Sequence, residues 1–168
     1  MLTSIIQHAP AWVWALLAAL IALGMSQTFP RSVNLRRATI APIALIVLSL
    51  YGVTGTFHGE PLALGGWAIG LAATVFVALS VGAWKGIGWS AQERRLQLPG
   101  SWWPLMIILG IFLTKFVVGA TLAMNPSEAA DPLFATVVGL AYGAFSGIFF
   151  SRGLAMWKVA HQALTARA

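Results

Sequence analysis

Five long apolar stretches, separated by short polar segments, dominate the hydropathy pattern of the chain. A membrane-spanning helix needs roughly 20 mostly apolar residues. Segments of this kind lie at about 10–29, 39–57, 62–84, 102–123 and 133–151. The segments between them contain the proline, glycine and charged residues that are typical of turns. The pattern predicts an all-α integral membrane protein with a single transmembrane domain over 1–168, of which 152–168 form a polar tail.

The composition supports this prediction. Hydrophobic residues make up 59% of the chain and charged residues only 8%, whereas soluble domains carry about 25% charged residues. A net charge of +6 would also suit a nucleic-acid-binding protein. However, the basic residues occur in short clusters between apolar segments and do not form one continuous surface. We therefore expect the lipid bilayer, and no nucleic acid, as the partner.

The charges also predict an orientation. Nine of the ten basic residues lie in alternate polar segments, which contain Arg31, Arg36, Arg37, Lys85, Arg94, Arg95, Arg152, Lys158 and Arg167. The other two polar segments contain no Lys or Arg, and their charged residues are Glu60, Glu128 and Asp131. The positive-inside rule places the basic segments in the cytoplasm. No Lys or Arg precedes Arg31, so the first apolar stretch lacks the basic start of a signal peptide. The sequence thus predicts five spans, with the N-terminus outside and the C-terminus inside.

Tryptophans occur near both ends of the expected spans, with Trp67 near the outer boundary and Trp84 near the inner one. Amphipathic rings of this kind are enriched at the level of the lipid headgroups. We therefore expect these side chains to anchor the helices and not to bind a ligand.

Similar landmarks recur along the chain and indicate an internal repeat. Paired arginines precede Pro42 in the second span and Pro104 in the fourth, while "EPL" opens the third span and "DPL" opens the fifth. This order predicts that spans 2–3 and 4–5 are parallel repeats, related by an axis along the membrane normal. Transporters place their sites between such repeats, but duplicated structural subunits would have the same pattern.

Glycines recur at every fourth position in two of the spans. Gly66 and Gly70 lie in the third span, and Gly139, Gly143 and Gly147 lie in the fifth. Small residues at this spacing allow helix backbones to approach closely. The glycine faces suit either packing inside the bundle or contact with a second copy in a homo-oligomer, and we favour internal packing.

Lys115 is the one basic residue inside an expected span. It lies about 13 Å from the outer end of that span, close to the midplane. A lysine there costs at least about 2.5 kcal/mol, so such residues usually face a bundle interior or a wet cavity. We expect a polar pocket that is formed by Lys115, Tyr51, Thr54 and Thr114, with His58 and Glu60 at its rim. Snorkelling of the lysine to the headgroups is the alternative.

Metal binding and catalysis find little support. His8, His58 and Glu60 lie near the outer boundary, but the His58–Glu60 spacing is not the i, i+4 spacing of a helical ligand pair. No Asp, Glu or His lies within an expected span, and the chain has no cysteine. A serine nucleophile within the membrane would therefore have no neighbouring His or carboxylate to act as its base. We expect no catalytic residue, no metal and no cofactor, and hence no enzyme.

The stretches "LPGSWWPLMIILGIFLTKFVVG" and "MLTSIIQHAPAWVWALLAALIALGMSQTFPR" resemble a family of uncharacterised, multi-spanning bacterial inner-membrane proteins. The resemblance covers the whole chain and implies a localisation but no activity. Two functions remain open. The first is a small permease or channel-like protein with Lys115 in a central polar pocket, and the alternative is a structural or assembly subunit of a membrane complex. A Schiff-base cofactor protein built on Lys115 is a distant third.

Overall fold

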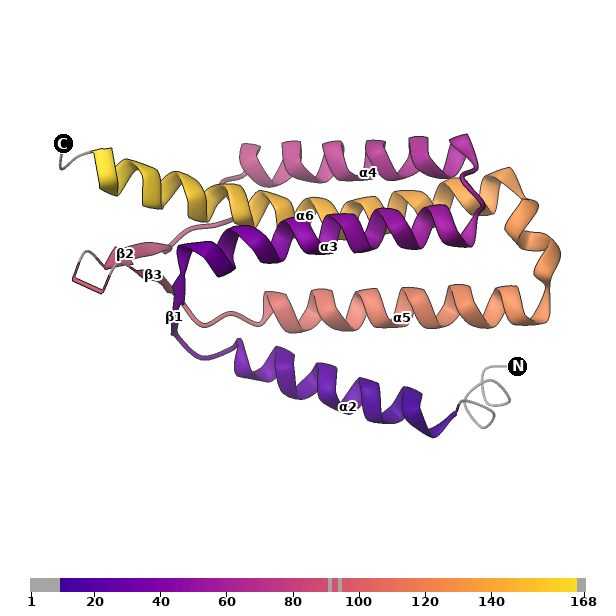
Figure 1. Ribbon diagram of the computed structural model, residues 1–168, viewed down its shortest axis with the longest axis horizontal. Coiled ribbons are helices and arrows are strands. Elements are labelled where there is room, and N and C mark those ends of the chain that lie inside the picture. The colour runs from indigo at the N-terminus through magenta and orange to yellow at the C-terminus, as the bar shows by residue number, and fades with distance from the viewer. Residues whose placement is uncertain (1–9, 91, 94, 166–168) are drawn as a thin grey trace. The chain divides into compact units, whose positions relative to one another are not determined.

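The computed structural model describes residues 10–90, 92, 93 and 95–165 (Figure 1). The elements follow one another as α2 (Ala11–Ser26), β1 (Arg31–Asn34), α3 (Leu35–Thr56), α4 (Pro61–Ser80), β2 (Gly88–Ser90), β3 (Arg95–Leu98), α5 (Trp103–Met124), the 3₁₀ helix η1 (Pro126–Ala130) and α6 (Pro132–Thr165). They form two compact units. One unit contains α2 and α5, and the other contains α3, α4, α6 and the three strands.

Four helices, α3, α4, α5 and α6, are long and apolar enough to cross a membrane. They coincide with the second to fifth predicted spans to within a few residues at most ends. The main exception is the C-terminal end of α6. The helix α2 is also apolar but has only 16 residues, which corresponds to about 24 Å. The prediction of a mostly helical, membrane-type protein is therefore confirmed, and four of the five spans meet the length criterion.

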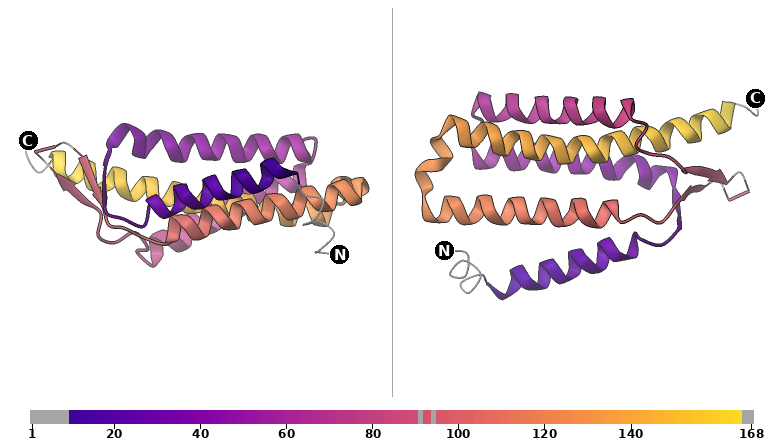
Figure 2. Two further views of the ribbon diagram at one scale, coloured as in Figure 1. Left: turned by 90° about the horizontal axis from the view of Figure 1, so that it is seen from below. Right: turned by 180° about the vertical axis from the view of Figure 1, so that it is seen from behind.

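The helices α2 and α5 pack against each other in opposite directions (Figure 2). Gly24, near the end of α2, lies so close to Leu105, near the start of α5, that an added Cβ atom would meet the Leu105 Cα at 3.0 Å. Just before α5 begins, the Ser101 N–H donates to the Gln27 carbonyl oxygen at 3.3 Å. The end of one helix thus lies beside the start of the other.

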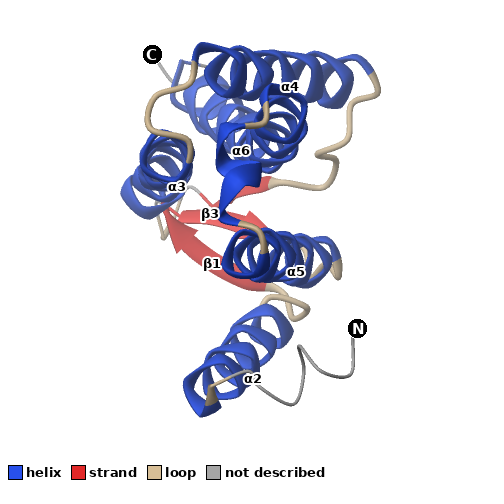
Figure 3. Cartoon of the chain, turned by 90° about the vertical axis from the view of Figure 1, so that its right-hand side faces the viewer, coloured by secondary structure: helices blue, strands red, loops and turns tan. Residues whose placement is uncertain are grey.

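The helix α6 packs along α4 and also contacts α3 (Figure 3). Glycines make the α4–α6 approach possible, because a Cβ atom at Gly139 or Gly143 would overlap the carbonyl oxygens of Ala63 and Trp67, respectively. Gly70 of α4 lies equally close to the Leu140 backbone. The glycine faces are therefore used within the chain. A homo-oligomer through Gly139, Gly143 and Gly147 stays a prediction, and it would have to displace α4.

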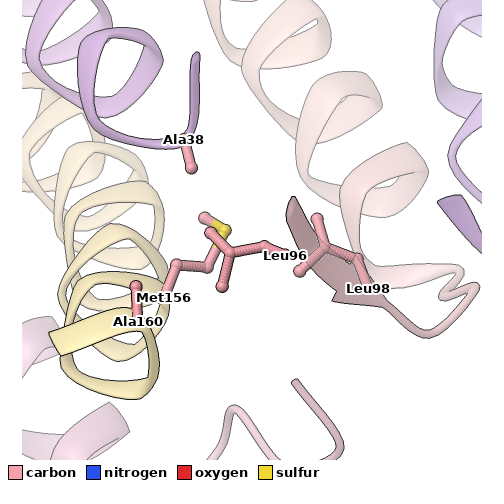
Figure 4. Packing of buried hydrophobic residues seen from close by; sticks show 5 residues of the cluster. All are labelled: Ala38, Leu96, Leu98, Met156 and Ala160. Atoms are coloured by element: carbon pink, nitrogen blue, oxygen red, sulfur yellow. The ribbon is translucent and has the colours of Figure 1, made fainter. Parts of the chain in front are cut away.

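Two of the polar segments form a small antiparallel sheet that the sequence did not predict. The strand order is β1-β3-β2, and Leu96 of β3 pairs with Val33 of β1 on one side and Trp89 of β2 on the other. Figure 4 shows Leu96 against Met156 of α6, in a buried cluster that also includes Ala38, Leu98 and Ala160. The sheet is thus attached to α3 and α6 by an apolar core of its own.

The polar tail expected after residue 151 is mostly the continuation of α6, which runs to Thr165. Its 34 residues correspond to about 51 Å, well beyond the roughly 30 Å hydrocarbon core of a bilayer. The tail is helical because Met156 and Ala160, four residues apart, lie on one face and are buried under the sheet.

The predicted repeat finds no support in the positions of its landmarks. α3 begins at Leu35, seven residues before Pro42, whereas α5 begins at Trp103, immediately before Pro104. In addition, α3 and α4 share one compact unit, while α5 and α6 belong to different units. The repeat stays a prediction.

Candidate functional site

The six residues of the predicted polar pocket belong to both units. Lys115 and Thr114 lie on α5, while Tyr51 and Thr54 lie on α3 and His58 and Glu60 follow it. The pocket as a whole stays a prediction.

On α5, Lys115 lies near the middle of the helix and is exposed. The hydroxyl of its neighbour Thr114 donates to the Gly110 carbonyl oxygen at 2.8 Å. Threonine side chains within helices commonly make this bond to the preceding turn. The Thr114 hydroxyl is therefore already engaged within its own helix.

On α3, the Thr54 hydroxyl also bonds within its helix, to the carbonyl oxygens of Leu50 at 3.1 Å and Tyr51 at 3.0 Å. The Tyr51 side chain is 74% exposed, so it is not enclosed by the unit that contains α3, α4 and α6. Neither side chain has the buried, unengaged polar group expected at the floor of a pocket.

His58 and Glu60 form the sharp connection between α3 and α4. His58 has a φ of 51° and Gly59 a φ of 78°, and the Gly59 N–H donates to the Thr54 carbonyl oxygen at 3.1 Å. Glu60 then occupies the N-cap position of α4. The third metal candidate, His8, lies outside the described residues. Among those described, no three His, Cys, Asp or Glu residues gather as metal ligands.

Sequence reasoning missed a polar network inside the α3/α4/α6 bundle. The Trp67 indole N–H of α4 donates to the Ser49 hydroxyl of α3 at 3.1 Å, and that hydroxyl donates to the Tyr142 carbonyl oxygen of α6 at 3.3 Å. The buried Ser146 hydroxyl donates to the same oxygen at 2.9 Å. Trp67 therefore ties α4 to α3, and its place at a membrane boundary stays a prediction. In the sequence, this network is indicated only by a serine within an apolar run. Such a serine needs a hydrogen-bond partner when it is buried.

A second polar cluster lies around Ser151 of α6, in the same unit. The Trp84 indole N–H donates at 3.0 Å to the hydroxyl of Ser151, which is fully buried and donates in turn to the Ile148 carbonyl oxygen at 2.9 Å. The next residue, Arg152, holds its guanidinium carbon 5.6 Å from the centroid of the Trp84 ring. At this distance a cation is attracted to the face of an indole.

Arg31 of β1 brings a second guanidinium to this region. Burial lowers the pKa of Arg31, and its charge acts on Arg152. Backbone packing brings the elements that carry the two residues close to each other. Gly153 lies against the Pro42 ring and near the Ala38 carbonyl oxygen of α3, and β1 leads directly into α3.

A family model covers residues 1–167, and its description reads "Family of unknown function (DUF6622)". The chain belongs to this family. The match confirms the resemblance read along the whole sequence. No curated protein and no solved structure matches the chain.

The description of DUF6622 names no activity. Ser49, Ser146 and Ser151 of this DUF6622 chain all donate to backbone carbonyl oxygens. A serine used in this way is not activated by a neighbouring base, as a nucleophile would be. Arg31 and Arg152, by contrast, are partly buried cations and are the candidates for contact with an anionic ligand.

Proposed function

We propose that this protein is a bacterial inner-membrane protein that acts as a structural or assembly subunit and not as an enzyme. The observation that carries the proposal is the solid packing of α4 against α6, where glycines bring the two backbones together. Within the described residues, every buried side-chain nitrogen or oxygen also has a hydrogen-bond partner. A bundle packed in this way suits a rigid support, because a solute path needs polar groups that are open to the solute.

The proposed topology has five spans, with the N-terminus outside and the C-terminus in the cytoplasm. Two observations support it. α2 runs along α5 in the opposite direction, so a bilayer around α5 would also surround most of α2. The basic residues Arg31, Lys85 and Arg95 lie in segments at the end opposite to Glu60 and Asp131, as the positive-inside rule requires.

Single cysteines test this topology, because the chain has none of its own. We expect a cysteine at Ser127, which is exposed, to react with an impermeant maleimide in intact cells. Cysteines at Ser90 and Gln92 should react only after the membrane is permeabilised. Gln92 is the sharper probe, because it is exposed whereas Ser90 is half-buried. Labelling of Gln92→Cys in intact cells would reverse the orientation.

A small permease or channel is the second candidate, and the central position of Lys115 on α5 favours it. A lysine at that depth is costly, so it implies a compensating role such as binding an anionic solute or a polar group of a partner helix. Lys115 is therefore compatible with both a structural subunit and a permease, and a flux measurement distinguishes the two functions.

The flux experiment uses the full chain in vesicles with entrapped chloride, nitrate or phosphate. If the protein is a structural subunit, efflux should equal that of protein-free vesicles for wild type and for Lys115→Met. The variant should be less stable in detergent if Lys115 bonds another helix, and at least as stable if Lys115 serves to bind a solute. Efflux that Lys115→Met abolishes and Thr114→Val retains would instead establish the permease.

The structural role also makes a positive prediction. Extracted from its own cells in mild detergent, the protein should migrate on native gels as one discrete species, larger than the purified chain. Migration at the size of the purified chain alone would contradict an assembly role.

A further inference from the structure

Arg31 and Arg152 lie far apart in the sequence, yet they share one region of the unit that contains α3, α4 and α6. Arg31 opens β1 and is paired with Leu98 of β3, whose buried side chain shares a cluster with Met156, one turn of α6 after Arg152. The charge of Arg31 acts on Arg152. Both side chains are half-buried. Repulsion between two partly desolvated cations costs free energy, and an anion held between them would remove that cost.

Packing holds both cations in place. The guanidinium of Arg152 lies over the Trp84 ring, which is fixed by its hydrogen bond to the buried Ser151. Arg31 is fixed through the backbone of β1, where it pairs with Leu98 of β3, and Leu98 belongs to the core beneath the sheet. Arg31 lies on a strand and Arg152 on a helix, so little conformational entropy would be lost when a ligand binds.

We propose that Arg31, Arg152 and Trp84 form a binding site for a phosphate group, supplied by the headgroup of an anionic phospholipid or by a soluble phosphate. The planar guanidinium matches two phosphate oxygens at once. The site lies where the apolar run of α6 ends at Ser151 and Arg152, which is the depth of the headgroups. Basic pockets at the cytoplasmic ends of membrane helices bind anionic headgroups in this way.

The test measures the melting temperature of the full chain in detergent during titration with phosphatidylglycerol, phosphatidylcholine or inorganic phosphate. The site variants are Arg31→Gln and Arg152→Gln. Arg37→Gln is the matched control, because it removes the same charge from an exposed position on α3. We expect phosphatidylglycerol to stabilise wild type and Arg37→Gln alike. Each site variant should need about tenfold more of it for the same shift, the change expected when one charge-assisted hydrogen bond is lost.

The added compounds distinguish the source of the phosphate. A shift with phosphatidylglycerol alone supports a lipid site, and an equal shift with inorganic phosphate supports a soluble ligand. The proposal is overturned if neither compound stabilises wild type, if phosphatidylcholine does so equally, or if Arg37→Gln loses as much as the site variants. If Arg152→Gln does not fold, Arg31→Gln decides alone, because β1 is an edge strand and Arg31 is not fully buried.

Discussion

Replacing Gly143 with leucine should prevent α4 and α6 from packing and leave little folded protein after extraction in detergent. A Cβ atom at this position would overlap the carbonyl oxygen of Trp67. That oxygen belongs to the backbone of α4, so no side chain can turn aside to make room. Alanine alone should lower the free energy of unfolding by about 1–3 kcal/mol, the usual cost of overpacking, and leucine by more. The measurement is the melting temperature together with the yield of monodisperse protein.

Gly55→Ala is the matched control for this prediction. Gly55 also lies in a helix, α3, but nothing lies within 4 Å of the Cβ atom that alanine would add. Alanine should therefore be neutral there or stabilise the helix by roughly 0.5–1 kcal/mol. The two Gly→Ala changes thus have opposite expected signs. Equal effects at the two positions would contradict the close packing of α4 against α6.

Leu96→Ala should detach the sheet from the helices. Leu96 is fully buried, with Met156 and Ala38 in the same cluster, and truncation of a buried leucine costs about 2–5 kcal/mol. The sheet is held by this one core, and its strands have only three or four residues. The expected result is a lower melting temperature, together with rapid proteolysis between residues 81 and 102 in a mild protease assay.

Gln97→Ala provides the control on the same strand. Gln97 is exposed, because neighbouring residues of β3 point to opposite sides of the sheet. Its truncation should change stability by no more than about 0.5 kcal/mol and leave the protease pattern intact. Proteolysis that is equally fast in both variants would mean that the sheet is held by its backbone pairing and not by the Leu96 core.

The sequence by itself determined those features that depend on local, one-dimensional information. Helix positions followed from the lengths of the apolar runs, because a bilayer requires a nearly constant length of apolar helix. The expected orientation followed from the charges of the loops. The sequence also marked Gly139 and Gly143 as points of close helix contact, since only small residues permit such an approach. It placed Lys115 at mid-span, because depth in a helix follows directly from residue count.

The tertiary structure decided which segments meet. β1 and β3 are more than sixty residues apart in the sequence, and strands this short show too few alternations for a period of two to be recognised. The hydrogen bonds from Trp67 to Ser49 and from Trp84 to Ser151 likewise join distant positions. The proposed site of Arg31 and Arg152 also joins residues that are far apart in the sequence. In each case the partner is chosen by helix packing and strand pairing over long distances, which the order of residues along one element does not encode.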